Sequence, residues 1–191
     1  MTGDASMPKE IELTVVHIDK RQVLGRLKKL GARYVTTHNY RRLEVPIKAG
    51  RVWLRLRTDG KKTTLTFKAR LGRGIDMTEE YEVEVGSFKE GVKLFQTLFK
   101  GNILGWDTKR IEYSLNGTMV TIDKWPKIPW SLEIEGKSKK AVYSTLRSLD
   151  IKGKNVGNAS IFRIYHEYGK EFVDSVKMDS DRLRRLLAGQ H

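Results

Sequence analysis

Hydrophobic and polar residues alternate along residues 52–68, VWLRLRTDGKKTTLTFK, with the two-residue period of a β-strand. The dipeptide Asp59-Gly60 favours a turn near the middle, so the pattern predicts a β-hairpin. The first arm has an aliphatic face and an arginine-bearing face: Val52, Leu54 and Leu56 against Trp53, Arg55 and Arg57. The second arm repeats this division, and Lys68 lies on its polar face. The hairpin is therefore apolar on one face and cationic on the other.

Alternation of the same kind predicts further strands at 10–16, within 33–47, and at 79–85, 108–115, 118–124 and 130–135. Many of their polar faces carry carboxylates. These are Glu10 and Glu12 in the first strand, Glu80, Glu82 and Glu84 in 79–85, and Asp123, Glu133 and Glu135 in the last two.

Apolar positions three to four residues apart predict helices at 19–30, 88–100, 137–149, 160–168 and 180–187. The predicted buried stripe of the second helix is Val92, Leu94, Phe95, Leu98 and Phe99. Strands grouped around inserted helices indicate an α+β fold, in which an antiparallel sheet closes into an eight-stranded barrel, or tunnel, with external helices. We expect three segments: a disordered start or expression remnant at 1–8, one folded domain at 9–170, and a basic helical tail at 171–191.

Composition excludes several classes of site. The 191 residues contain no cysteine, which excludes disulfides and thiolate sites and suits a cytoplasmic location. The four histidines lack ligand spacing, and no run of 18 apolar residues or secretory signal is present. The net charge of +14 favours an anionic partner, whether nucleic acid, a phosphate-rich small molecule or an acidic surface.

The three glutamates of 79–85 help to decide whether the charged strand faces lie in solvent or around an enclosed site. Neighbours about 7 Å apart on one strand face repel by about 0.6 kcal/mol in bulk water and about 2.4 kcal/mol at an effective dielectric constant of about 20. Each strand taken alone fits a half-buried sheet with its charged face in water. Taken together, the faces fit one enclosed site, where a metal cation would offset the repulsion and phosphates would bind Arg55, Arg57, Lys68 and Arg110.

The order of the strand motifs adds a family resemblance. The stretches EIELT (10–14), WLRLR (53–57), TLTFK (64–68), EEYEVEV (79–85), KRIEYSL (109–115), VTID (120–123) and LEIEG (132–136) are similar to strand motifs of the CYTH superfamily, the triphosphate tunnel metalloenzymes. They occur in the family's order and, with SIFRIYHEYG near the end, span about residues 10–168. The chain most resembles bacterial members labelled class IV adenylyl cyclase-like or thiamine triphosphatase-like.

The resemblance implies an eight-stranded tunnel that binds a triphosphate with Mg²⁺ or Mn²⁺. It implies metal ligands at Glu10, Glu12, Glu82, Asp123, Glu133 and Glu135. It implies phosphate contacts from Arg55, Arg57, Lys68 and Arg110, with Glu10, Glu12, Arg57 and Lys68 as the catalytic set. Thr14 stands where the family has a lysine, and because a hydroxyl carries no charge, a phosphate contact is lost or supplied by another cation.

The leading functional prediction is metal-dependent hydrolysis of inorganic tripolyphosphate or of an organic or nucleoside triphosphate. The alternatives are an adenylyl cyclase, which forms cyclic AMP and pyrophosphate from ATP, and a non-catalytic module that binds nucleotides or RNA ends. Nucleic acid is thus an open but less favoured partner, no membrane partner is expected, and the chain is expected to be a monomer or homodimer.

Two weaker motifs have plainer readings. Residues 86–93, GSFKEGVK, lack the ending of a phosphate-binding loop and are interpreted as a strand-to-helix turn. Trp125 and Trp130 could stack on a base at the tunnel rim, but a packed hairpin turn is favoured.

Overall fold

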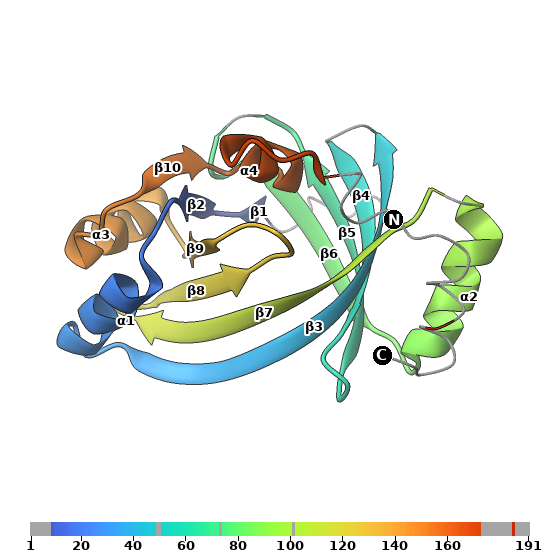
Figure 1. The fold of residues 1–191 in the computed structure, drawn as a ribbon, viewed down its shortest axis with the longest axis horizontal. Coiled ribbons are helices and arrows are strands. Elements are labelled where there is room, and N and C mark those ends of the chain that lie inside the picture. The colour runs from blue at the N-terminus through green and yellow to red at the C-terminus, as the bar shows by residue number, and fades with distance from the viewer. Residues whose placement is uncertain (1–8, 49–50, 73, 101, 173–184, 186–191) are drawn as a thin grey trace, which may run out of the picture.

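The computed structural model describes residues 9–48, 51–72, 74–100, 102–172 and Arg185. Its elements are, in order, β1 (Lys9–Glu10), β2 (Glu12–Val16), α1 (Lys20–Lys29), β3 (Arg33–Lys48), β4 (Val52–Thr58), β5 (Thr63–Arg70), β6 (Thr78–Glu84), α2 (Phe88–Phe99), β7 (Leu104–Leu115), β8 (Thr118–Lys124), β9 (Trp130–Glu135), α3 (Lys139–Leu149), β10 (Lys154–Gly157) and α4 (Ile161–Glu167) (Figure 1). The predicted helix at 180–187 and most of the predicted tail fall outside the described residues.

The strands form one curved antiparallel sheet, which confirms the α+β class (Figure 1). The strand order is β1-β6-β5-β4-β3-β7-β8-β9-β2-β10. The prediction of eight strands in a closed barrel is wrong in number, since the sheet has ten strands, and closure is not confirmed because no ladder joins its two ends within the described residues.

Two local features account for the difference. The predicted strand at 10–16 is interrupted at Ile11, so that β1 pairs with β6 while β2 pairs with β9. The four residues of β10, KNVG, are too few and too polar to show a strand period, yet they pair with β2. Because only Ile11 separates β1 from β2, one short stretch of chain reaches both sides of the curved sheet.

The helices cover the sheet at separate places. Figure 1 shows α1 and α3 together at one end of the sheet and α2 against the outside of the other half. In α1 and α3, Val23, Leu27, Val142 and Leu149 belong to the apolar core under β2 and β7–β9. In α2, Val92 and Phe95 pack on β3 and β4, whereas Leu94 and Leu98 are exposed, so the predicted stripe is wrong at those two positions.

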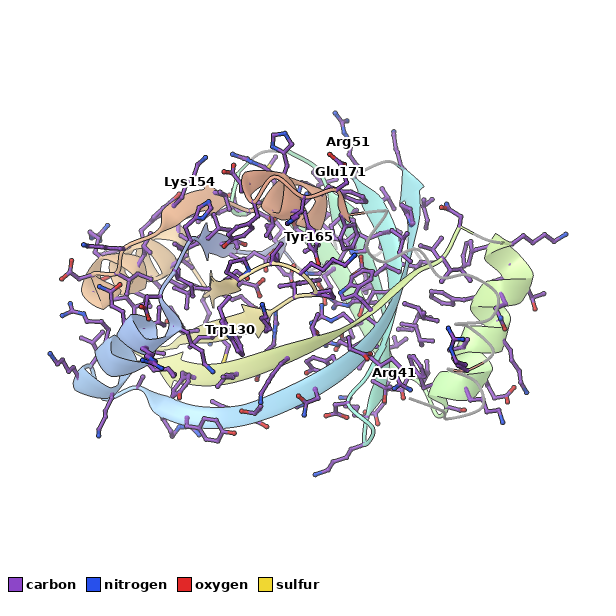
Figure 2. All side chains as sticks on the ribbon, viewed as in Figure 1. Arg41, Arg51, Trp130, Lys154, Tyr165 and Glu171 are labelled. Atoms are coloured by element: carbon purple, nitrogen blue, oxygen red, sulfur yellow. The ribbon has the colours of Figure 1, made fainter. Side chains whose placement is uncertain are left out.

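The C-terminal helix α4 closes a third apolar cluster, in which Ile164 and Tyr165 pack with Trp106. Tyr165 points from α4 into the interior (Figure 2), and its hydroxyl donates a hydrogen bond to the carbonyl oxygen of Pro126 at 2.7 Å. Of the described helices, none is long and apolar enough to span a membrane.

Candidate active site

A cavity of about 310 Å³ lies on the concave side of the sheet and is lined by both acidic and basic side chains. Its seven carboxylates are Glu10, Glu12, Glu44, Glu80, Glu82, Glu133 and Glu135. Its six cations are Arg42, Arg55, Arg57, Lys68, Arg70 and Arg110. The alternation of strand residues explains this lining, because each strand turns its charged face toward the cavity.

The strand β6 shows the arrangement most clearly. Its carboxylates Glu80 and Glu82 face the cavity, while Tyr81 and Val83 on the opposite face are exposed. Glu84, the third glutamate of the strand, lies outside this cavity lining and pairs with Lys62, Nζ to Oε2, at 3.1 Å. On β6 the carboxylate Glu80 is thus less exposed than the apolar side chains of the opposite face, which is the reverse of an ordinary half-buried strand.

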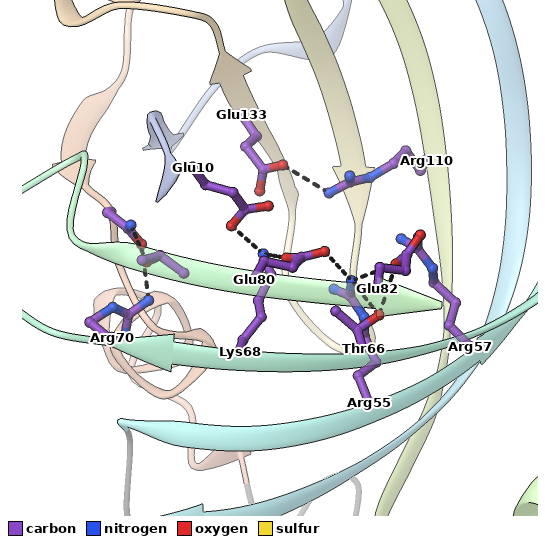
Figure 3. Close-up of polar contacts among 12 residues, drawn as sticks. Glu10, Arg55, Arg57, Thr66, Lys68, Arg70, Glu80, Glu82, Arg110 and Glu133 are labelled. Carbon is purple, nitrogen blue, oxygen red and sulfur yellow. Dashed lines mark hydrogen bonds and ion pairs between the residues drawn. The ribbon is translucent and has the colours of Figure 1, made fainter. Parts of the chain in front are cut away.

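Ion pairs connect the cations of the hairpin to the carboxylates of neighbouring strands (Figure 3). Lys68 Nζ lies 2.7 Å from Glu10 Oε2 and 2.5 Å from Glu80 Oε2. Arg55 Nη2 lies 3.5 Å from both Glu80 Oε1 and Glu82 Oε2. Arg57 Nη2 lies 3.2 Å from Glu82 Oε2. The predicted phosphate-binding cations therefore have carboxylate partners that an anionic ligand could replace.

Arg110 forms a second group with two carboxylates. Its Nε and Nη2 donate to Asp123 Oδ1 at 2.8 Å and Oδ2 at 2.7 Å, and Nη2 also donates to Glu133 Oε1 at 3.1 Å. Burial opposes the charge, but Asp123 and Glu133 raise the pKa of Arg110. Although burial alone would raise it, Arg110 and Lys68 hold the pKa of Glu133 below its ordinary value.

Asp123 differs in position from the other predicted metal ligands. It is 2% exposed and is absent from the cavity lining, and both of its oxygens accept hydrogen bonds from Arg110. This geometry orients the guanidinium of Arg110. A role for Asp123 as a metal ligand stays a prediction.

The side-chain carboxylates of two predicted ligands, Glu12 and Glu135, have no hydrogen-bond or ion-pair partner within the described part of the chain. They are cross-strand neighbours on β2 and β9. Burial raises the pKa of Glu12 to about 8, an effect that Lys68 opposes and the nearby glutamates reinforce. Partial desolvation, followed by the charges of Glu133 and Glu10, also raises the pKa of Glu135. Carboxylates in this situation favour a proton or a cation as partner.

The carboxylate oxygens of the cavity are of the type that a hard divalent cation such as magnesium prefers. They do not form a finished coordination sphere: no three acidic or histidine side chains among the described residues are grouped closely enough to hold a metal ion. The cavity therefore has the type of ligand atom that magnesium prefers, and the carboxylates of Glu12 and Glu135 have no other partner among the described residues.

Arg42 is a cavity residue that the sequence analysis missed. It is 2% exposed on β3, its Nε donates to Thr108 Oγ1 at 3.0 Å, and its Nη2 has no partner among the described residues. Burial, with the charges of Arg55 and Arg110, lowers its pKa to about 9. The signal was present in the alternation of 33–47, which places Arg42 and Glu44 on the same strand face.

Thr14, which replaces the expected lysine, also lines the cavity and is the cross-strand neighbour of Glu133. Arg42 is among the cations that lower the pKa of Glu133. Arg42, with Arg110, Lys68 and Arg55, is thus one of the cations that act on Glu133, the strand neighbour of the uncharged Thr14.

A second cavity of about 240 Å³ adjoins the first and shares Arg57 and Glu82 with it. There His38 Nδ1 lies 2.9 Å from Asp59 Oδ2, and Glu112 lies on the same lining. The charged lining consequently continues past Arg57 rather than ending there.

The structure also shows how residues 86–93 and the two tryptophans Trp125 and Trp130 are placed. Ser87 caps α2 by accepting a hydrogen bond from the amide of Glu90, so residues 86–93 form a strand-to-helix turn. Trp130 packs against the core with Lys20 Nζ 4.1 Å from its ring centre, as expected of a packed turn. Trp125 packs near Trp106 but also reaches the cavity lining.

Comparison with known proteins agrees with this geometry. Residues 44–154, more than half of the chain, match the CYTH domain family. A conserved hypothetical protein of Pyrococcus furiosus is 24% identical, with a TM-score of 0.66 over 75% of this chain and 91% of the other. A Pyrococcus horikoshii protein is 19% identical, with a TM-score of 0.67 over 87% and 99%.

A third similar structure is an adenylyl cyclase candidate of Hippeastrum described as having a dominant triphosphatase activity. It is 18% identical, with a TM-score of 0.54 over 85% of this chain and 96% of the other. At these identities the three structures relate the folds alone. No curated protein matches the sequence.

Proposed function

Because the chain belongs to the CYTH family, we propose that it is a metal-dependent phosphohydrolase that binds a triphosphate in the charged cavity. The observation that carries the proposal is the pairing of Lys68, Arg55 and Arg57 with carboxylates inside one cavity. A solvent-facing sheet would have no need to hold these cations together, whereas a polyphosphate chain needs several cations in a row.

Binding would proceed by exchange of partners. The phosphate oxygens would replace Glu10, Glu80 and Glu82 as acceptors for Lys68, Arg55 and Arg57. Arg110 is held in place by Asp123 and Glu133, and the two N–H groups of its Nη1 would be available to phosphate. Since the cations are fixed before the substrate arrives, little reorganisation is needed when charge develops in the transition state.

The carboxylates released by this exchange, with Glu12, Glu133 and Glu135, are the residues that would hold Mg²⁺ or Mn²⁺. When bound, such a cation supplies neutralising charge and lowers the pKa of a water that attacks the terminal phosphorus. The protein's own part is to align the phosphates through its arginines and lysine.

Product analysis tests the proposal. With Mg²⁺ or Mn²⁺, purified protein is expected to release inorganic phosphate and a diphosphate from a triphosphate, and chelation by EDTA is expected to abolish the release. Chromatography of the products formed from ATP distinguishes the reactions, because cyclic AMP with pyrophosphate would identify a cyclase instead. Binding that persists with EDTA, weakens steeply with salt and gives no product would support the non-catalytic alternative.

A further inference from the structure

Two stacked rings lie beside Arg57 in the second cavity. They belong to His38 and Tyr40, which share one face of β3 with Arg42, because side chains two residues apart on a strand point the same way. The ring centres are 4.8 Å apart, with an angle of 21° between the ring planes. The guanidinium carbon of Arg57 lies 4.4 Å from the centre of the Tyr40 ring. Tyr40 therefore contacts both the imidazole of His38 and the guanidinium of Arg57.

The register of the sheet accounts for the contact between Tyr40 and Arg57. Arg42 on β3 is the cross-strand neighbour of Arg57 on β4. Tyr40, two residues from Arg42, is then a diagonal neighbour of Arg57, at a spacing of about 7–8 Å that aromatic and long side chains can span. Arg42 lies farther from the Tyr40 ring, at 5.3 Å, and is nearer to Trp125, at 4.9 Å. The Tyr40 ring is thus placed for Arg57 in particular.

The other end of the stack is fixed to the hairpin turn. Asp59 Oδ1 accepts hydrogen bonds from the amides of Lys62 at 2.8 Å and Lys61 at 2.9 Å, and these bonds hold the pKa of Asp59 at about 2. Its Oδ2 lies 2.9 Å from His38 Nδ1, and because an ionised carboxylate only accepts, Nδ1 donates. Asp59 therefore orients the imidazole that stacks on Tyr40.

The ring holds Arg57 in a different way from an ion pair. Arg57 Nη2 lies 3.2 Å from Glu82 Oε2, its one ion-pair partner among the described residues, and a phosphate that replaced Glu82 would remove this contact (Figure 3). An aromatic ring attracts the cation through the ring face and accepts none of the five in-plane N–H groups of the guanidinium. Arg110 instead uses its N–H groups on Asp123 and Glu133. The ring contact can therefore persist while Arg57 changes its acceptor.

We propose that Tyr40 is a positioning residue, whose ring holds the guanidinium of Arg57 while the N–H donors of Arg57 pass from Glu82 to a phosphate group. The inference rests on the proposed function, because it takes Arg57 as a phosphate-binding residue. It makes part of the second cavity, the stack of His38 and Tyr40, a support for binding in the first.

Removal of the ring tests this role. Titration calorimetry would measure binding of two probes, β,γ-methylene-ATP with Mg²⁺ and tripolyphosphate in EDTA. Tyr40→Leu is expected to weaken binding about 3- to 30-fold, which corresponds to the range of cation–π contacts. Tyr40→Phe, which keeps the ring, should bind within about twofold of the unmodified protein. Tyr81→Leu is the matched control, because Tyr81 is 47% exposed on the face of β6 opposite the cavity.

A double-mutant cycle with Arg57→Gln distinguishes positioning of Arg57 from a general effect on the fold. In the Arg57→Gln background, Tyr40→Leu should change binding by less than about twofold, because the residue that the ring positions is gone. If thermal unfolding shows that Tyr40→Leu does not fold, Tyr40→Met takes its place in the cycle. An undiminished loss in the Arg57→Gln background, or binding by Tyr40→Leu equal to that of the unmodified protein, would overturn the inference and leave the hydrolase intact.

Phosphate release by the same proteins separates the inference from the proposed function. Binding that depends on the Tyr40 ring through Arg57, without release of phosphate from any triphosphate, would overturn the hydrolase and keep the positioning role. Absence of both binding and release in the unmodified protein would overturn both proposals.

Discussion

At the scale of single residues, the cavity depends on cations whose carboxylate partners are not all equivalent. Lys68 and Arg55 share carboxylates that also line the cavity, whereas Asp123 is withdrawn from it and serves Arg110 alone. Alternation in the sequence placed most of these residues on the correct face. It could not distinguish Asp123 from Glu133, because the direction in which a carboxylate points depends on the position of Arg110 in three dimensions.

Arg42 should strengthen triphosphate binding, because its buried Nη2 has no protein acceptor among the described residues. Arg42→Gln is expected to weaken binding of a triphosphate by about 1.5–3 kcal/mol, which is typical of a hydrogen bond to a charged group. Titration calorimetry measures the change. Arg41→Gln is the control. Arg41 is next to Arg42 in the chain, but its Nε pairs with Asp107 Oδ1 at 3.5 Å. An equal effect of both changes would contradict a specific role for Arg42.

Asp123→Asn should destabilise the protein, because one oxygen that accepts from Arg110 becomes an amide donor. The expected loss is about 2 kcal/mol in the free energy of unfolding, measured by urea denaturation. Glu84→Gln, which removes an exposed ion pair with Lys62, should change stability by less than about 1 kcal/mol. Equal stability of Asp123→Asn and the unmodified protein would show that Arg110 does not depend on this pair.

The pKa of Glu12 makes a prediction about pH. Its folded value of about 8 lies above the ordinary value of 4.5, so the folded state binds the proton more tightly than the unfolded state. The stabilising effect is complete below about pH 4.5 and is lost as the pH rises through about 8.

Without divalent cations, Glu12→Gln should therefore gain stability relative to the unmodified protein as the pH rises from 5 to 8. Thermal unfolding across this range measures the difference. Glu90→Gln, a surface change beside Lys93, should leave the pH dependence unaltered. Parallel curves for the unmodified protein and Glu12→Gln would contradict the pKa assignment.

At the scale of elements, the local sequence predicted which segments form strands and helices. It predicted less well which strands pair and which faces pack together. The charged faces and the hairpin follow from residue order alone. The break at Ile11 and the short strand β10 do not, because both exist only through pairing with distant strands. The exposure of Leu94 and Leu98 in α2 likewise depends on which side of the helix meets β3 and β4.

Two helix glycines provide a matched test of packing. A Cβ at Gly91 in α2 would lie 2.7 Å from Leu56 Cδ2, whereas a Cβ at Gly25 in α1 would meet nothing within 4 Å. Gly91→Ala should therefore lower the free energy of unfolding by about 1–3 kcal/mol, and Gly25→Ala should raise it by about 0.5–1 kcal/mol. Chemical denaturation measures both. Stabilisation by Gly91→Ala would show that α2 is not closely packed on β4.

At the scale of the whole molecule, net charge and site charge differ. The chain carries +14, yet the cavity holds seven carboxylates against six cations, so the excess positive charge lies elsewhere. That excess can attract anions toward the protein. Binding within the cavity instead requires the paired cations to exchange carboxylates for phosphates.

The initial rate of phosphate release from a triphosphate tests this central claim most directly. The account predicts release that needs Mg²⁺ or Mn²⁺ and falls by at least about 100-fold in Lys68→Gln, because Lys68 is removed from between Glu10 and Glu80. Lys93→Gln, on α2 and outside both cavity linings, should retain the rate of the unmodified protein. No phosphate release with either metal, or equal rates for Lys68→Gln and Lys93→Gln, would contradict the account.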